Sequence, residues 1–224
     1  MSAGEQLTPA AREALRRYLG VLAAERASVS SVTEPAAAWR VHVEDSLSGL
    51  QANELRGASR IADLGAGPGF PGVALAAALP GASVDLLESV GRKCRFLRTA
   101  LREAGIANAA VVCRRAEEWA AAEGREAYEA VTARALGSLS TIAELASPLL
   151  RDRGVLVAWK GERDPHEEEA LAGARDALAM HPEEVLEVVP FAGSRTRHLH
   201  VLRKIGSTPE RLPRRPGMAA KRPL

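Results

Sequence analysis

A glycine-rich loop separates a short apolar run from a longer run of Ala, Val and Leu in "IADLGAGPGFPGVALAAAL", residues 61–79. This order predicts a strand, a tight turn and a helix. Glycines at such a turn let a ligand approach the backbone closely, and the N-terminus of the following helix presents N–H groups without a partner. The loop limits the possible folds more than any other feature, because it predicts an α/β domain with a ligand at the end of its first strand.

Short apolar runs alternate with helical patterns from residue 59 onward. Such alternation predicts right-handed βαβ units and a parallel, doubly wound sheet. The last two apolar runs are joined by "PFAGSRT", which suits a hairpin, so the sheet is expected to finish with an antiparallel pair. Seven strands with this hairpin are typical of the Rossmann-like class I S-adenosylmethionine (SAM)-dependent methyltransferase fold, and not of a dehydrogenase domain. The predicted strands are 60–64, 83–88, 109–113, 129–134, 154–160, 183–189 and 197–204, and predicted helices lie near 71–79, 90–104, 138–149 and 164–180.

Two further regions flank this α/β domain. Residues 9–27 are predicted as a helix with Thr8 as its cap and Pro9 in its first turn, and a second helix is expected from Pro35. At 224 residues the chain has room for one α/β domain with a small appendage, and not for two large domains. We therefore predict an N-terminal helical cap (1–55), a methyltransferase domain (56–205) and a basic, flexible C-terminal tail (206–224).

Positive charge is concentrated at the C-terminus. Between Arg203 and Leu224 there are seven Lys or Arg residues and one acid, Glu210, which gives +6 and leaves −4 for residues 1–202 within a net charge of +2. Segregated positive charge attracts polyanions, so an anionic partner is predicted, with a merely solubilising tail as the alternative. Because only 4% of the residues are aromatic, the tail is expected to contact phosphates and not to stack on bases. Its deletion is then expected to weaken RNA binding and to change cofactor affinity little.

Composition also argues against several classes of protein. No run of about 18 apolar residues is present, and the N-terminus lacks the pattern of a secretory signal, so a cytoplasmic protein without a membrane partner is predicted. Cys94 and Cys113 belong to no CxxC or Cys/His cluster. Neither a disulfide framework nor a metal site is predicted from them, and both are expected to be small core residues.

The glycines Gly67, Gly69 and Gly72 have the spacing GxGxxG, and Glu88 follows about 20 residues on, which satisfies the dinucleotide pattern. Asp63, ahead of the glycines, favours a different ligand. Its carboxylate would repel a pyrophosphate but can pair, directly or through water, with the cationic amino-acid end of SAM. We therefore predict SAM as the cofactor, with an NAD-dependent oxidoreductase and a ligand-free turn as the alternatives.

Two later strand ends carry further candidates for cofactor binding. Glu88 ends the second strand, where its carboxylate can accept hydrogen bonds from both ribose hydroxyls. The third strand continues into "CRRAEEW", and in this fold the adenine lies near that position. The backbone of Ala116 and the carboxylate of Glu117 are therefore predicted to hold the adenine, with a plain exposed acid as the alternative for Glu117.

The motifs "DLGAGPGFPGVALA", "LLESVGRKCRFLR", "RRAEEW", "TARALGSL", "AWKG" and "RHLHVLRK" occur in the order and spacing of the RsmG family, also called GidB. The chain resembles this family from about residue 15 to its C-terminus. The resemblance implies a SAM-dependent methyltransferase that modifies N7 of a guanine in a 16S ribosomal RNA loop near the decoding site, and whose loss is associated with low-level streptomycin resistance. Beside Asp63 and Gly67, it implies cofactor contacts from Gly65, Phe70, Glu88, Ser89, Val90, Ala116, Glu117 and Arg134, and substrate or catalytic roles for Arg115, Lys160, Arg197 and His42.

The sequence departs from the family pattern at two positions in the cap. His42 lies in "VHVEDS", where Val41 replaces the usual Arg, and Ser28 stands where Asn is usual. These departures concern the RNA contacts of the cap and not the reaction. Alternatives remain open for two residues: a satisfied interhelical histidine for His42, and a structural ion pair with Glu88 or Asp63 for Arg134.

The expected chemistry needs no general base, because guanine N7 already carries an in-plane lone pair. The sequence has no Cys nucleophile beside a loop and no Asn-Pro-Pro-aromatic motif of the kind that amino-group methylation uses. Catalysis is then expected to come mostly from aligning N7 with the sulfonium methyl group. The Arg and Lys residues are expected to bind phosphate or the O6 edge. A monomer without a DNA partner is predicted, with another RNA, a small molecule or a protein as alternative methyl acceptors.

Overall fold

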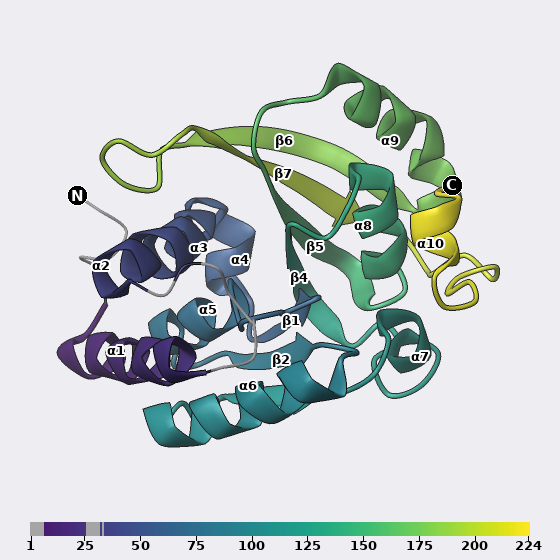
Figure 1. Cartoon of the computed structure of the whole chain (residues 1–224). Coiled ribbons are helices and arrows are strands. Elements are labelled where there is room, and N and C mark those ends of the chain that lie inside the picture. Colours follow the sequence, from purple (N-terminus) through teal and green to yellow (C-terminus); the bar gives the residue numbers. More distant parts are fainter. Residues whose placement is uncertain (1–6, 26–31, 33) are drawn as a thin grey trace.

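In the part of the chain that the structure describes, residues 7–25, 32 and 34–224, seven strands form one mixed sheet (Figure 1). The arrangement is taken from a computed structural model. The strand order is β3-β2-β1-β4-β5-β7-β6, in which β7 runs antiparallel to both of its neighbours and the other pairs are parallel. The predicted sheet and its antiparallel last strand are thereby confirmed. The strands are β1 (Arg60–Leu64), β2 (Ser83–Leu87), β3 (Ala109–Val112), β4 (Tyr128–Arg134), β5 (Leu150–Lys160), β6 (Met180–Val188) and β7 (Arg197–Lys204).

Helices cover both faces of this sheet (Figure 1). The N-terminal cap, which includes α1, lies with α5 and α6 over one face, while α7, α8, α9 and α10 lie over the other. Among the described residues, no helix is long and apolar enough to cross a membrane. The helices are α1 (Pro9–Ala24), α2 (Pro35–Ala38), the π-helical η2 (Trp39–Glu44), α3 (Asp45–Leu47), the 3₁₀ segment η3 (Ser48–Gln51), α4 (Asn53–Gly57), α5 (Gly72–Ala78), α6 (Gly91–Ala104), α7 (Ala116–Ala120), α8 (Leu139–Ala146), α9 (Pro165–Leu178) and α10 (Met218–Lys221).

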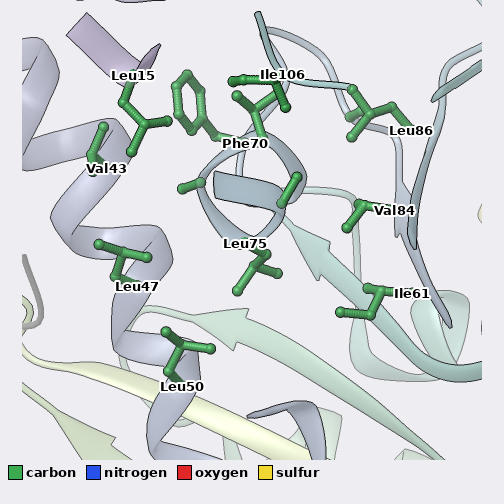
Figure 2. Packing of buried hydrophobic residues seen from close by; sticks show 14 of the residues in the cluster. Leu15, Val43, Leu47, Leu50, Ile61, Phe70, Leu75, Val84, Leu86 and Ile106 are labelled. Carbon is green, nitrogen blue, oxygen red and sulfur yellow. The ribbon is translucent and has the colours of Figure 1, made fainter. Parts of the chain in front are cut away.

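The N-terminal cap shares its hydrophobic core with the sheet domain. Leu15 of α1 and Leu47 of α3 are buried against Phe70 of the glycine-rich loop and Leu75 of α5 (Figure 2). Burying a leucine side chain contributes roughly 1.5–3 kcal/mol. Because the cap buries apolar side chains against the helix that follows the glycine-rich loop, its packing holds that loop in place.

The two cysteines correct the sequence prediction. Cys94 in α6 and Cys113, directly after β3, form a disulfide with their Cα atoms 5.8 Å apart. Cys94 is buried as expected, whereas Cys113 is exposed. The pair brings together residues 19 positions apart because α6 packs beside β3 after crossing over the sheet. Neither residue belongs to a spacing motif, so the sequence did not indicate the pairing.

The C-terminal residues differ from the flexible tail expected from the sequence. Leu212 and Ala219 are buried, and α10 packs against α8 (Figure 1). Arg214 donates two hydrogen bonds of 2.6 Å to the two carboxylate oxygens of Glu144 in α8. The Lys204 ammonium is fully buried and donates to backbone carbonyls. Part of the positive charge that suggested a free cationic tail is therefore neutralised or solvated inside the fold.

Candidate functional site

Two cavities lie side by side at the edge of the sheet where the parallel strands end. The first cavity, of about 380 Å³, is lined by the ends of β1 and β2, the start of α7, part of α8 and the C-terminal segment. The second cavity, of about 450 Å³, is lined by the cap, the ends of β4 and β5 and the start of β7. Ala135, in the loop after β4, lines both. Both volumes fall within the range of roughly 300–1,000 Å³ that small-molecule sites occupy.

The glycine-rich loop forms part of the first cavity through Gly65. Gly65 and Gly67 have φ angles of +63° and +55°, in the left-handed region that glycine adopts without strain. A Cβ on Gly65 would lie 2.6 Å from Cδ1 of Leu136, another lining residue. The backbone conformation therefore favours glycine at position 65, and a larger residue would also force the Leu136 side chain to shift.

Glu88 joins this loop to the end of β2. One of its carboxylate oxygens accepts the Gly67 N–H at 3.1 Å, and the other accepts the Val90 N–H at 2.8 Å. The Lys93 ammonium lies 3.9 Å from the carboxylate oxygen that accepts the Gly67 N–H. Glu88 and Ser89 both line the first cavity, whereas Val90 contributes its backbone N–H and has an exposed side chain. Glu88 is thus held in a fixed orientation beside the cavity.

Asp63 lies in the interior of the protein and not at the wall of a cavity. Its side chain is fully buried and accepts hydrogen bonds from the Gly72 N–H and the Thr132 hydroxyl, both at 2.9 Å. Asp63 lines neither cavity. Burial raises its pKa to about 6, against the opposing effect of these two hydrogen bonds. Asp63 therefore fixes the start of α5 from within the protein and is not part of the lining of either cavity, whereas the sequence predicted that it pairs, directly or through water, with the cationic end of the cofactor.

Phe70 is buried between the cap and α5. Its ring stacks on His42 with the centroids 5.0 Å apart and the planes at 11°, and it meets Tyr18 edge-on at 5.6 Å. The Tyr18 hydroxyl donates a 2.8 Å hydrogen bond to the carbonyl of Pro68. Phe70 therefore supports the glycine-rich loop and His42 from behind, and it lines neither cavity.

The start of α7 supplies three of the predicted residues to the first cavity, namely Arg115, Ala116 and Glu117. Arg115 was expected on the substrate side, but the structure places it with the cofactor candidates, at an exposed position. Glu117 accepts a 2.8 Å hydrogen bond from the N–H of Gly217. The sequence did not indicate this contact with the C-terminal segment, since it joins residues 100 positions apart.

Asp45 organises the second cavity and was not singled out from the sequence. One carboxylate oxygen accepts a hydrogen bond from Arg134 at 2.7 Å, and the other accepts one from Arg197 at 3.0 Å. Its backbone carbonyl accepts the Trp159 indole N–H at 3.0 Å. Asp45 follows His42 by three positions in the same helical stretch, which puts the two side chains on one face. This spacing from His42 is the sequence signal that could have identified Asp45.

The sheet register explains why the arginines meet. Arg134 at the end of β4 pairs with Trp159 of β5, and Lys160 of β5 pairs with His198 of β7. Because β7 is antiparallel to β5, its first residue lies at the edge where β4 and β5 end. Arg134 therefore lines the second cavity and pairs with Asp45, not with Glu88 or Asp63.

Lys160 and His42 complete the second cavity. The Lys160 ammonium donates to the carbonyl of Gly137 at 3.0 Å and lies 2.8 Å from a Glu167 carboxylate oxygen. Burial, with a smaller contribution from the charge of Arg134, lowers the pKa of His42 to about 4. His42 is therefore a neutral imidazole near pH 7.

Two remaining expectations concern the cap and metal ions. The carbonyl of Val41 accepts a 3.2 Å hydrogen bond from Arg134, whereas Ser28 lies outside the described residues. Within the described ranges, no group of three or more His, Cys, Asp or Glu residues is arranged to hold a metal ion.

Comparison with known proteins identifies the family of this chain. Residues 11–200 match the family described as rRNA small subunit methyltransferase G (GidB). A relative named ribosomal RNA small subunit methyltransferase G from Rubrobacter xylanophilus is 42% identical over 215 residues, covering 94% of this chain and 82% of the relative. A relative of the same name from Moorella thermoacetica is 33% identical over 224 residues, covering 99% and 93%.

Solved structures show the same fold. The crystal structure of a predicted O-methyltransferase from Agrobacterium tumefaciens aligns with a TM-score of 0.55 at 24% identity, over 72% of this chain and 80% of that chain. Fibrillarin from Aeropyrum pernix, solved with natively bound SAM, aligns with a TM-score of 0.54 at 18% identity, over 71% and 72%. The class I methyltransferase fold is thereby confirmed. Because the family match covers residues 11–200 and these two relatives are 42% and 33% identical to it over most of its length, this chain belongs to the rRNA small subunit methyltransferase G (GidB) family.

Proposed function

We propose that this protein transfers a methyl group from SAM to N7 of a guanine in 16S ribosomal RNA, in a loop near the decoding site. The observation that carries the proposal is the pair of adjoining cavities, one beside the glycine-rich loop and Glu88 and the other lined by cations. The names of the relatives support ribosomal RNA of the small subunit as the substrate. The choice of guanine N7 rests on the family resemblance and on the chemistry of the site.

The residues of the first cavity fit SAM, which supplies an electrophilic methyl group on its sulfonium when bound. Each oxygen of Glu88 accepts one backbone N–H and keeps a further lone pair, with which it can accept from the ribose hydroxyls. The backbone at Gly65 lines the cavity without a side chain in the way. Ala116 and Glu117 would hold the adenine at the other end of this cavity.

The residues of the second cavity fit a nucleotide. The side chain of Lys160 is one-fifth exposed and that of Arg197 one-third exposed. The Lys160 ammonium and the Arg197 guanidinium can therefore both reach a phosphate or the O6 edge of a guanine. Arg115, exposed at the first cavity, is assigned to the RNA backbone. Arg134 holds the shape of this cavity through Asp45.

The electrostatics suit an acceptor that needs no deprotonation. N7 already has its lone pair, and His42, with a pKa of about 4 and a stacked contact with Phe70, is placed to orient the substrate or the loop and not to take up a proton. Methylation leaves the base positively charged, so the cations act on phosphate or O6 and not on N7. Rate enhancement then comes from alignment of the acceptor with the methyl group.

The test is methylation of small ribosomal subunits, and separately of naked 16S RNA, from a strain that lacks this protein. With SAM present, the purified chain should produce 7-methylguanosine at one position, and Glu88→Ala should abolish it. The strain should show low-level streptomycin resistance. Methylation of another atom or another RNA would contradict the substrate assignment. Thermal stabilisation by NAD and not by S-adenosylhomocysteine (SAH) would contradict methyl transfer altogether. We also assign the reaction to a cytoplasmic monomer that needs no DNA or membrane partner.

A further inference from the structure

The last twelve residues of the chain, 213–224, form a segment that we call the C-terminal strap. Three of its residues, Gly217, Ala219 and Ala220, line the first cavity opposite the glycine-rich loop. The strap lies beyond residue 200, where the match to the family ends, so the family match gives it no role.

Three anchors hold the strap against the sheet domain. Arg214 forms a bidentate ion pair with Glu144 of α8, whose carboxylate also accepts the N–H of Leu224 at 3.3 Å. Glu144 is 3% exposed and Arg214 20%, so this pair is largely shielded from solvent. Removing one member of such a pair leaves a buried charge without its partner.

The second and third anchors lie at the cavity itself. The Thr141 hydroxyl of α8 donates to the carbonyl of Ala219 at 3.1 Å. The N–H of Gly217 donates to one carboxylate oxygen of Glu117 at 2.8 Å. Glu117 is the residue that we assign to the adenine, so the strap fixes the orientation of a ligand-binding side chain.

The strap leaves space for a ligand. With the strap in place, the first cavity still measures about 380 Å³, which is within the roughly 300–1,000 Å³ of small-molecule sites. Ala219 is 2% exposed and presents a small apolar surface there. These features are those of a cavity wall and not of a plug.

We propose that the C-terminal strap is the outer wall of the cofactor cavity over the adenine, and that it supports cofactor affinity by covering the base and orienting Glu117. The assignment of the cavity to SAM rests on the proposed function. The strap's role differs from that of the RNA-binding tail expected from the charge pattern, since its Arg214 is engaged by Glu144.

The test is titration calorimetry of SAH into four proteins: the full chain, a chain ending at Leu212, Arg214→Ala and Arg211→Ala. Arg211 is the matched control, because it is exposed, lies just before the strap and donates a 3.0 Å hydrogen bond to the carbonyl of Ala177, away from the first cavity. We expect the truncation and Arg214→Ala to weaken SAH binding about tenfold or more, and Arg211→Ala to bind like the full chain. Arg214→Lys, which keeps the charge but not the bidentate geometry, should recover part of the affinity.

Hydrogen exchange gives a second readout that does not depend on turnover. SAH should slow amide exchange in residues 213–224 of the full chain, and circular dichroism should show that the truncated protein remains folded. Equal SAH affinity of the folded truncated protein and the full chain would overturn the proposal that the strap supports cofactor binding. Tighter binding by the truncated protein would also overturn it, because the strap would then occlude the cavity. Failure of the full chain to bind SAH would instead refute the proposed function, and the wall with it.

Discussion

The carboxylate of Asp45 accepts a 3.0 Å hydrogen bond from Nε of Arg197 across 152 residues of sequence. Asp45 comes from the cap, and Arg197 begins β7. The same carboxylate binds Arg134 at the end of β4 through its other oxygen. One buried acid therefore fixes two cations of the proposed substrate cavity and joins the cap to the sheet.

Replacing this acid tests the arrangement. Asp45→Asn should lower the free energy of unfolding by about 2 kcal/mol, because the substitution removes the negative charge that two partly buried arginines share. The catalytic efficiency on ribosomal RNA should fall more than the affinity for SAH. Urea unfolding and initial rates measure the two effects. Glu44→Gln, the neighbouring acid in the same helical stretch, is the control and should change both little; equal loss in the two variants would contradict a special role for Asp45.

Lys160 gives a prediction about salt. Lys160→Ala should raise the KM for ribosomal RNA and reduce the slope of log affinity against log salt by about 1, as loss of one phosphate contact does. SAH affinity should stay unchanged, because Lys160 lines the second cavity and not the first. Arg175→Ala on the exposed side of α9 removes the same charge elsewhere and serves as the control. An unchanged salt slope in Lys160→Ala would show that Lys160 does not contact an RNA phosphate.

Asp63 gives a prediction about pH. Because burial raises its pKa from 3.8 to about 6, the folded protein binds the proton more tightly than the unfolded chain, and the stability due to this carboxyl group is lost as the pH rises through 4–6. Asp63→Asn cannot titrate, so its unfolding free energy relative to wild type should rise by about 2 kcal/mol between pH 4 and pH 7.

His42 supplies the control of opposite sign. Its pKa is lowered to about 4, so the unfolded chain binds the proton more tightly and the histidine adds stability as the pH rises from 4 to 6.5. The unfolding free energy of His42→Gln relative to wild type should therefore fall over that range. Urea unfolding at several pH values measures both variants, and slopes of the same sign would contradict the assigned environments.

The disulfide predicts a dependence on reductant. Reduction of the Cys94–Cys113 bond in air-oxidised protein should lower the free energy of unfolding by about 3 kcal/mol, as expected for a loop of this length. Cys113→Ser should abolish the effect of dithiothreitol. Mass spectrometry of non-reduced peptides should detect the cross-link, and two free thiols in air-oxidised protein would contradict the pairing.

Local sequence patterns were sufficient for the seven strands, for the longer helices and for the loop that holds the proposed cofactor, but not for the short helices α7 and α10. The alternation of strands and helices, the hairpin before β7 and the glycines with positive φ angles each depend on residues close together in the chain. Glu88 could also be identified locally, because it stands at the end of the next strand after the glycine-rich loop and its helix. Turn geometry, helix periodicity and capping act over a few residues, and the sequence displays them directly.

The remaining features depend on which distant segments pack together. Asp63 precedes the glycines as the methyltransferase pattern requires, yet hydrogen bonds from Gly72 at the start of α5 and from Thr132 of β4 hold its carboxylate in the interior. The Cys94–Cys113 pair requires α6 to lie beside β3, and Arg214 loses its role as a free cation only when α10 packs against α8. Side-chain direction, ion pairing and burial are set by these contacts and not by spacing along the chain.

The sequence by itself determined the class of fold, the glycine-rich loop and the set of cations at the strand ends. Only the tertiary structure decided how those cations are arranged, because the sheet order places the end of β4 and the start of β7 on either side of β5. Asp45 of the cap then meets Arg134 and Arg197 at that edge. The physical reason is that an ion pair needs atoms within a few ångströms, and for residues far apart in the chain only the folded packing of the sheet and cap sets that distance.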